Sequence, residues 1–322
     1  MVSSKAGETQ PLVWGISGRG GNTSTKPSGF SLKEYWRLAR MHKFPFGSIL
    51  IFWPAAWGYL LGAQAAKPGP IELTVTLAAL LLWSTILHSA GCVVNDLCDV
   101  EFDRQVERTK HRPLAAGTVS IFGAWVFMLL QVVALGLLLT FVNRNAVISG
   151  VFNIFPLAAL YPLMKRITWW PQAWLGLAMN WGLPTAWLMA SPNDYKSSPL
   201  WVLMFGIFCW TIFYDTIYAC QDRKDDINAG VKSTALLFGD YVKPILAIFG
   251  AIFVATLAYA GQALNLGAEF FIISVGGCAV HLTWQLVTLD VENPKDCGAK
   301  FVANGDLGYI VTAGMLATWF LH

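Results

Sequence analysis

The sequence predicts an all-α protein, a multi-pass membrane bundle of about nine transmembrane helices. Of its 322 residues, 55% are hydrophobic and 13% are charged, and the mean hydropathy is +0.52. Soluble domains contain about 25% charged residues, so the composition excludes an ordinary soluble protein. Several apolar runs approach the roughly 20 residues that a helix needs to cross a bilayer. The expected spans are 46–65, 71–94, 119–140, 146–164, 169–190, 199–220, 243–262, 267–289 and 306–321.

The distribution of basic residues supports this number of spans. With the N-terminus in the cytosol, 19 of the 22 Lys and Arg residues fall on the cytosolic side and three on the other, as the positive-inside rule requires. The net charge of +3 is small, and no nucleic-acid partner is indicated. The expected surroundings are the lipid bilayer.

The N-terminal residues differ in composition from the rest of the chain. Residues 1–30 are rich in Gly, Ser and Thr, and we expect a disordered cytosolic tail. Residues 31–43 have the pattern of a short amphipathic helix at the membrane interface, with capping-box spacing between Ser31 and Glu34. The remainder, 31–322, is expected to form a single transmembrane domain.

Three carboxylates directly follow the second expected span. Asp96, Asp99 and Asp103 lie at i, i+3 and i+7, so a helix presents them on one face, next to Asn95. Such carboxylates repel one another unless a cation lies among them. Mg²⁺ prefers oxygen ligands and usually binds one or two carboxylates, with water and substrate phosphate in its other positions. The segment therefore predicts half of a diphosphate site.

A second acidic segment ends the sixth expected span. Asp215, Tyr218 and Asp222 repeat the i, i+3, i+7 spacing, and Asp226 lies four residues further on. Both segments lead into basic loops on the same side of the membrane, so we expect them to form one site, with loop Arg and Lys neutralising the remaining phosphate charge. Of the 19 acidic residues, nine belong to these segments: Asp96, Asp99, Glu101, Asp103, Glu107, Asp215, Asp222, Asp225 and Asp226.

Other interpretations of the acidic residues stay open. They can be polar residues at the membrane interface, or the ion path of a secondary transporter. A transporter predicts acids near mid-span, whereas these lie at helix ends beside basic loops. A membrane terpene cyclase would use the same diphosphate chemistry without an aromatic acceptor. His88, two turns before Asp96, is interpreted as a packing residue.

Five motifs occur in order along the chain. They are N-D-x-x-D-x-x-x-D, R-P-L-x-x-G, Y-P-L-M-K-R at 161–166, D-x-x-Y-A-x-x-D-x-x-x-D and G-V-K-S-T-A-x-x-F-G. From about Leu38 to the C-terminus the chain resembles the UbiA family of intramembrane prenyltransferases, and its M-K-R and K-S-T-A segments resemble the 4-hydroxybenzoate polyprenyltransferase branch. The resemblance implies nine helices around a central cavity. It also implies an enzyme, a transferase of alkyl groups other than methyl, that ionises an allylic diphosphate with Mg²⁺ and joins the prenyl group to an aromatic ring.

The resemblance also assigns residues to the site. The expected catalytic acids are Asp96, Asp99, Asp103, Asp215, Asp222 and Asp226, and these six with Asn95 are the expected Mg²⁺ ligands. Substrate binding is expected from Asn95, Lys110, Arg112, Tyr161, Lys165, Arg166, Tyr218, Arg223, Lys232 and Arg40. For residues 110–117, the alternative to phosphate binding is that the Pro and Gly of this segment only form a turn.

The aromatic residues near the motifs suit a cationic intermediate. Tyr161, Tyr214 and Tyr218 are expected to stabilise an allyl cation by cation–π attraction. Either the diphosphate or an Asp then takes the ring proton, and the sequence leaves this choice open.

Two branches of the family compete. Chain length and the short Gly/Ser-rich N-terminus, without a clear transit peptide, favour a fungal meroterpenoid enzyme in the endoplasmic reticulum. It would transfer farnesyl from farnesyl diphosphate to a phenolic aromatic acid or polyketide, with its N-terminus and active-site loops in the cytosol. The alternative is the 4-hydroxybenzoate polyprenyltransferase of ubiquinone biosynthesis in the mitochondrial inner membrane.

Overall fold

The computed structural model describes residues 31–223, 226–227 and 230–321, and within them the regular structure is helical throughout. The expected tail, residues 1–30, lies outside the described residues. The elements are α1 (Leu32–Leu38), η1 (Met41–Lys43), α2 (Ser48–Gly62), α3 (Pro70–Asp103), α4 (Ile121–Leu139), α5 (Arg144–Phe152), η2 (Asn153–Ala158), α6 (Ala159–Ile167), α7 (Pro171–Asn180), α8 (Gly182–Ala190), α9 (Ser198–Ala219), η3 (Cys220–Asp222), α11 (Thr234–Phe238), η4 (Gly239–Tyr241), α12 (Val242–Ala263), η5 (Phe270–Gly276), α13 (Gly277–Thr288) and α14 (Pro294–Leu321).

The all-α membrane class is confirmed, but the number of spans is not. Among the described residues, six stretches are long and apolar enough to cross a bilayer: Pro70–Asp103, Ile121–Leu139, Arg144–Ile167, Ser198–Asp222, Thr234–Ala263 and Phe270–Thr288. The helix α2 is apolar but has 15 residues. Nine spans therefore stay a prediction.

Two expected spans have different boundaries in the structure. The range 169–190 is divided into α7 and α8, because Pro184 has no N–H to donate to the carbonyl of Asn180. The range 306–321 is only the second part of α14, which begins at Pro294. Pro is favoured at the first position of a helix, and the ion pair of Asp296 with Lys300, one turn apart, supports the added turns.

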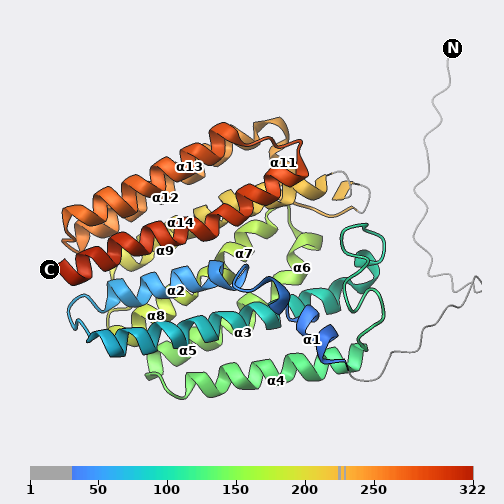
Figure 1. Cartoon of the computed structure of the whole chain (residues 1–322), viewed down its shortest axis with the longest axis horizontal. Coiled ribbons are helices and arrows are strands. Elements are labelled where there is room, and N and C mark those ends of the chain that lie inside the picture. Colours follow the sequence, from blue (N-terminus) through green and yellow to red (C-terminus); the bar gives the residue numbers. More distant parts are fainter. Residues whose placement is uncertain (1–30, 224–225, 228–229, 322) are drawn as a thin grey trace, which may run out of the picture.

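The long helices run side by side, and the connections with acidic and basic residues gather at one end of the bundle (Figure 1). This end carries α1, α6 and α11, whereas the C-terminus of α14 lies at the opposite end. The helix α2 packs against α3, α8 and α14, and all of its residues are buried. A helix that is apolar on every side suits this central position.

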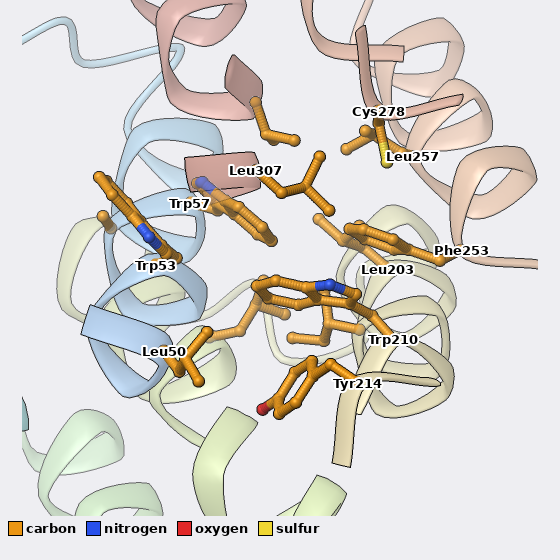
Figure 2. Close-up of a cluster of buried hydrophobic side chains, with 14 of the residues drawn as sticks. Leu50, Trp53, Trp57, Leu203, Trp210, Tyr214, Phe253, Leu257, Cys278 and Leu307 are labelled. Carbon is orange, nitrogen blue, oxygen red and sulfur yellow. The ribbon is translucent and has the colours of Figure 1, made fainter. Parts of the chain in front are cut away.

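An aromatic cluster fills the core between α2, α9 and α12 (Figure 2). The rings of Trp57, Trp210 and Phe253 lie 5.4–6.2 Å apart, centroid to centroid. The indole N–H groups of Trp57 and Trp210 donate to Thr312 and Asn304 of α14. Because the buried indole donors have partners, the cluster gains apolar contact without an unpaired polar group.

Candidate active site

A polar cavity of about 440 Å³ lies at the end of the bundle where both acidic segments meet. Its walls come from the end of α3, the following loop, the end of α6, and the end of α9 with the segment after it. The predicted residues that line it are Asn95, Asp99, Asp103, Arg112, Tyr161, Lys165, Arg166, Asp215, Tyr218, Asp222, Asp226 and Lys232. The structure thus brings residues from three distant parts of the sequence to one cavity.

A more apolar cavity of about 280 Å³ adjoins the polar one. The two share Asn95, Arg112, Tyr161 and Tyr218, which therefore stand at their junction. Asp96 and Arg40 line this second cavity, together with apolar side chains of α2, α3 and α7. A ligand with a charged head and an apolar tail matches the pair of cavities.

The first acidic segment continues α3 beyond its apolar part. At 1.5 Å per residue, the 34 residues of α3 extend over about 51 Å, more than the roughly 30 Å hydrocarbon core. Its charged end can therefore project past the hydrocarbon. Asp96, Asp99 and Asp103 are all buried, on one helix face as their spacing predicts.

Basic side chains from three separate segments neutralise these carboxylates. Arg40 forms a two-pronged ion pair with Asp96, with N–O distances of 2.7 and 2.8 Å. Arg112 lies 3.2 Å from an oxygen of Asp96 and 2.9 Å from an oxygen of Asp103. Lys165 and Arg166, at the end of α6, both pair with Asp99. Pairing of this kind is what permits carboxylates to be buried.

Arg108 joins the loop after the first acidic segment to the second acidic segment, and it was not among the residues expected in the site. Its guanidinium donates to both oxygens of Asp222, at 2.9 and 2.7 Å, and to the hydroxyl of Tyr218 at 3.2 Å. The only signal in the sequence was its place in the basic loop after α3. Its partner lies 114 positions away, and helical spacing cannot predict such a contact.

Two residues expected to bind substrate do not line either cavity. Lys110 pairs with Glu107 on the exposed loop, at 2.6 Å. Arg223 pairs with Glu292, at 3.3 Å. In both cases a nearer acid, outside the cavity, holds the basic side chain.

Tyr214 is fully buried in the aromatic core, where its hydroxyl accepts a hydrogen bond from Thr211. Asp225 lies outside the described residues.

The basic side chains at the cavity mouth influence one another. Burial lowers the pKa of the Lys43 ammonium, and the neighbouring Arg40, Arg108 and Arg112 lower it further. Burial also lowers the pKa of Arg108, but Tyr218 and Asp222 outweigh this effect and hold it above its ordinary value. Positive charges crowded in this way favour an anionic ligand.

The oxygen donors fit Mg²⁺ only together with a phosphate ligand. Among the residues that the structure describes, no three His, Cys, Asp or Glu side chains are grouped closely enough to hold a metal ion. Mg²⁺ needs only one or two carboxylates when phosphate and water fill its other positions. Asp96 and Asp99 on one wall, and Asp215 and Asp222 on the other, are suitable donors for that arrangement.

Residues 51–309 match the family model of the UbiA prenyltransferases. The chain belongs to this family. It is 47% identical over 294 residues to the UbiA prenyltransferase claS of Ampulloclitocybe clavipes, with 91% of this chain and 93% of that protein covered. The 4-hydroxybenzoate geranyltransferase 1 of Lithospermum erythrorhizon is 41% identical, with 88% and 90% covered. The mitochondrial 4-hydroxybenzoate polyprenyltransferase of Drosophila melanogaster is 40% identical, with 88% and 71% covered.

Solved structures of UbiA homologues have the same fold. The apo homologue from Aeropyrum pernix K1 has a TM-score of 0.70 at 23% identity, with 84% of this chain and 97% of that chain covered. A homologue from Archaeoglobus fulgidus, bound to DMAPP and Mg²⁺, has a TM-score of 0.66 at 17% identity, with 90% and 100% covered. The family resemblance expected from the motifs is thus confirmed, and this UbiA protein is a prenyl-transferring enzyme.

Arg108 provides a test of the site. We expect Arg108→Ala to lower the turnover of prenyl transfer by about 10²-fold or more, the usual loss when a preorganised group facing developing charge is removed. Arg104→Ala is the matched control, because Arg104 lies in the same loop but pairs with the exposed Glu101. Steady-state assays of the purified proteins measure both. Equal activities of the two variants would exclude Arg108 from the site.

Proposed function

We propose that this UbiA enzyme transfers a prenyl group, preferably farnesyl, from an allylic diphosphate to a ring carbon of a phenolic acceptor, with Mg²⁺ as cofactor. The observation that carries the proposal is the polar cavity, where two acidic segments and basic side chains of separate loops surround a space joined to an apolar cavity. The solved relative bound to DMAPP and Mg²⁺ supports the assignment of donor and metal.

The polar cavity would bind the diphosphate of the donor. Mg²⁺, bound by Asp96 and Asp99 on one side and Asp215 and Asp222 on the other, would stabilise charge on the departing diphosphate. Arg108, Arg112 and Lys165, which pair with these carboxylates in the structure, would then be available to phosphate oxygens. Such an exchange would leave Asp96, Asp99 and Asp222 with a positive partner throughout.

The apolar cavity would hold the prenyl chain and the acceptor. Breaking the bond between allylic carbon and oxygen leaves an allylic cation next to Tyr161 and Tyr218, at the junction of the cavities. The acceptor ring attacks this cation through carbon, and loss of the ring proton restores aromaticity. An acidic acceptor would place its carboxylate near Lys43, which lines the apolar cavity. The apolar walls exclude water that would otherwise consume the cation.

A meroterpenoid-type reaction in the endoplasmic reticulum membrane is the preferred biological role. The identity to the Ampulloclitocybe UbiA prenyltransferase, whose name does not include a mitochondrial location, is 47%, against 40% to the mitochondrial Drosophila enzyme. Nine spans with the polar cavity at the cytosolic side are part of the proposal. The second candidate is 4-hydroxybenzoate polyprenyl transfer in mitochondria, favoured by the names of several relatives.

The carboxylates can be tested individually. We expect Asp96→Ala and Asp222→Ala to lose measurable turnover while they still insert and purify as the parent protein does, because each removes a donor that the metal and diphosphate need. Glu107→Ala is the control, since Glu107 lies on the exposed loop and pairs with Lys110. Near-parental activity of either Asp variant would refute the assignment of that carboxylate.

Removal of divalent metal gives a second test. We expect EDTA to stop product formation and added Mg²⁺ to restore it, because Mg²⁺ joins the carboxylates to the diphosphate. The measurement is product formation by the purified enzyme before chelation, after chelation and after readdition. Full activity in excess EDTA would show that the acids serve another purpose.

Product identification tests the reaction itself. Membranes containing the enzyme are incubated with geranyl, farnesyl or a long polyprenyl diphosphate, each with 4-hydroxybenzoate or an orsellinic-type acid. We expect farnesyl on the polyketide-type acid as the main product, identified by mass. Use of only the long donor, on 4-hydroxybenzoate, would decide for the mitochondrial type of reaction. A prenyl product without any aromatic ring would indicate a cyclase.

A further inference from the structure

A second apolar cavity, of about 330 Å³, lies further along the same helices than the apolar cavity of the site. The site cavity is lined by Ile51 of α2 and Leu87 of α3. The further cavity is lined by Ala55, one turn along α2, and by Trp83 and Leu80, along α3. The two cavities therefore follow one another along the same two helices.

One hydrophobic cluster separates these cavities. It contains Ile51 and Leu87 from the wall of the site cavity, and Trp83 and Leu139 from the wall of the further cavity, with Ile154 packed among them. These side chains are all buried, and Trp83, only 8% exposed, is the largest of them. Trp83 thus lines the further cavity and packs in one cluster with side chains of the site cavity, one turn of α3 from Leu87.

Building on the proposed function, we propose that Trp83 closes the prenyl-binding cavity and limits the donor to about fifteen carbons. A donor with a longer chain would have to displace this indole to reach the further cavity. Trp83 is in this sense a specificity-determining residue, and it acts on the far end of the chain rather than on the reacting carbon.

The spacing along α3 agrees with a fifteen-carbon limit. Trp83 lies 13 residues before Asp96, which corresponds to about 20 Å along the helix axis. The extended main chain of a farnesyl group measures about 14 Å, given carbon–carbon bonds of about 1.5 Å. The remaining 6 Å or so accommodates the diphosphate next to Asp96. One more isoprene unit would add about 5 Å and would collide with the indole.

The further cavity has the character of a space for apolar chain. Its lining includes Leu80, Leu138 and Leu139 and no Asp, Glu, Lys or Arg. Its rim includes Val75 and Phe141, which are 64% and 85% exposed, so it opens toward the lipid-facing surface. Once the indole is removed, a longer prenyl chain could pass into this space without meeting a charged group.

The test compares donor length profiles of the full-length protein and its variants. Trp83→Ala removes the indole that is proposed to close the cavity. Trp83→Leu replaces it with a smaller apolar side chain, for use if the Trp83→Ala protein does not accumulate in the membrane. Trp83→Ala combined with Leu80→Trp places the indole one turn further along α3, about 5 Å away. Trp125→Ala is the control, because Trp125 is half-exposed on α4 and contributes to neither cavity.

Each protein is given geranyl, farnesyl, geranylgeranyl and a longer polyprenyl diphosphate with Mg²⁺. Two quantities are measured: the rise in Tm on donor binding, and transfer to 4-hydroxybenzoate or an orsellinic-type acid. We expect the parent protein and Trp125→Ala to prefer farnesyl over longer donors by about tenfold or more, the selectivity an apolar pocket of fixed size can supply. Trp83→Ala should gain about tenfold or more for the longer donors and keep its use of farnesyl.

The combined variant should accept geranylgeranyl but not the longer donor, because its limit has moved by one turn. Identical donor profiles for the parent and both Trp83 variants would overturn the proposal, since the chain would then leave the site by another route. Equal use of all donors by the parent protein would overturn it as well. If no diphosphate raised the Tm of any variant, the proposed function itself would fail, and this outcome is distinct from the other two.

Discussion

The structure depends on the pairing of buried carboxylates with basic side chains. An unpaired charge costs several kcal/mol to bury, and Asp96 and Asp99 are almost completely buried. Their counterions, Arg40, Arg112 and Lys165, come from segments before α2, after α3 and at the end of α6. These ion pairs therefore attach three connections to the end of α3, and they define the mouth of the cavity.

The same pairing is compatible with the proposed binding of a metal diphosphate. Basic side chains pair with Asp96, Asp99 and Asp103, and Arg108, from the loop after the first acidic segment, pairs with Asp222 and Tyr218 of the second. A metal diphosphate brings both signs of charge, so it can replace these contacts without leaving a buried charge alone. The aromatic core around Trp57 and Trp210 lies apart from this exchange and keeps the surrounding helices in place.

The apolar side of the site depends on packing rather than charge. Ile51 and Leu87 line the apolar cavity of the site, and Trp83 lines the further cavity. The three side chains belong to one hydrophobic cluster. Close-packed side chains of this kind define a volume with little tolerance for an additional group. Under the two proposals, donor length and donor ionisation would depend on different residues, about 20 Å apart along α3.

The sequence by itself determined the class of the protein, many of its helical segments and the two acidic faces. These follow from hydropathy and from the i, i+3, i+7 spacing of Asp96, Asp99 and Asp103, which are local properties of a helix. Only the tertiary structure decided which loop cations face the cavity: Arg108 does, whereas Lys110 and Arg223 pair with acids outside it. It also placed Trp83, which lines the further cavity, in one cluster with Ile51 and Leu87 of the site cavity. The reason is physical: these contacts join residues far apart in the chain, and their geometry depends on how the helices pack.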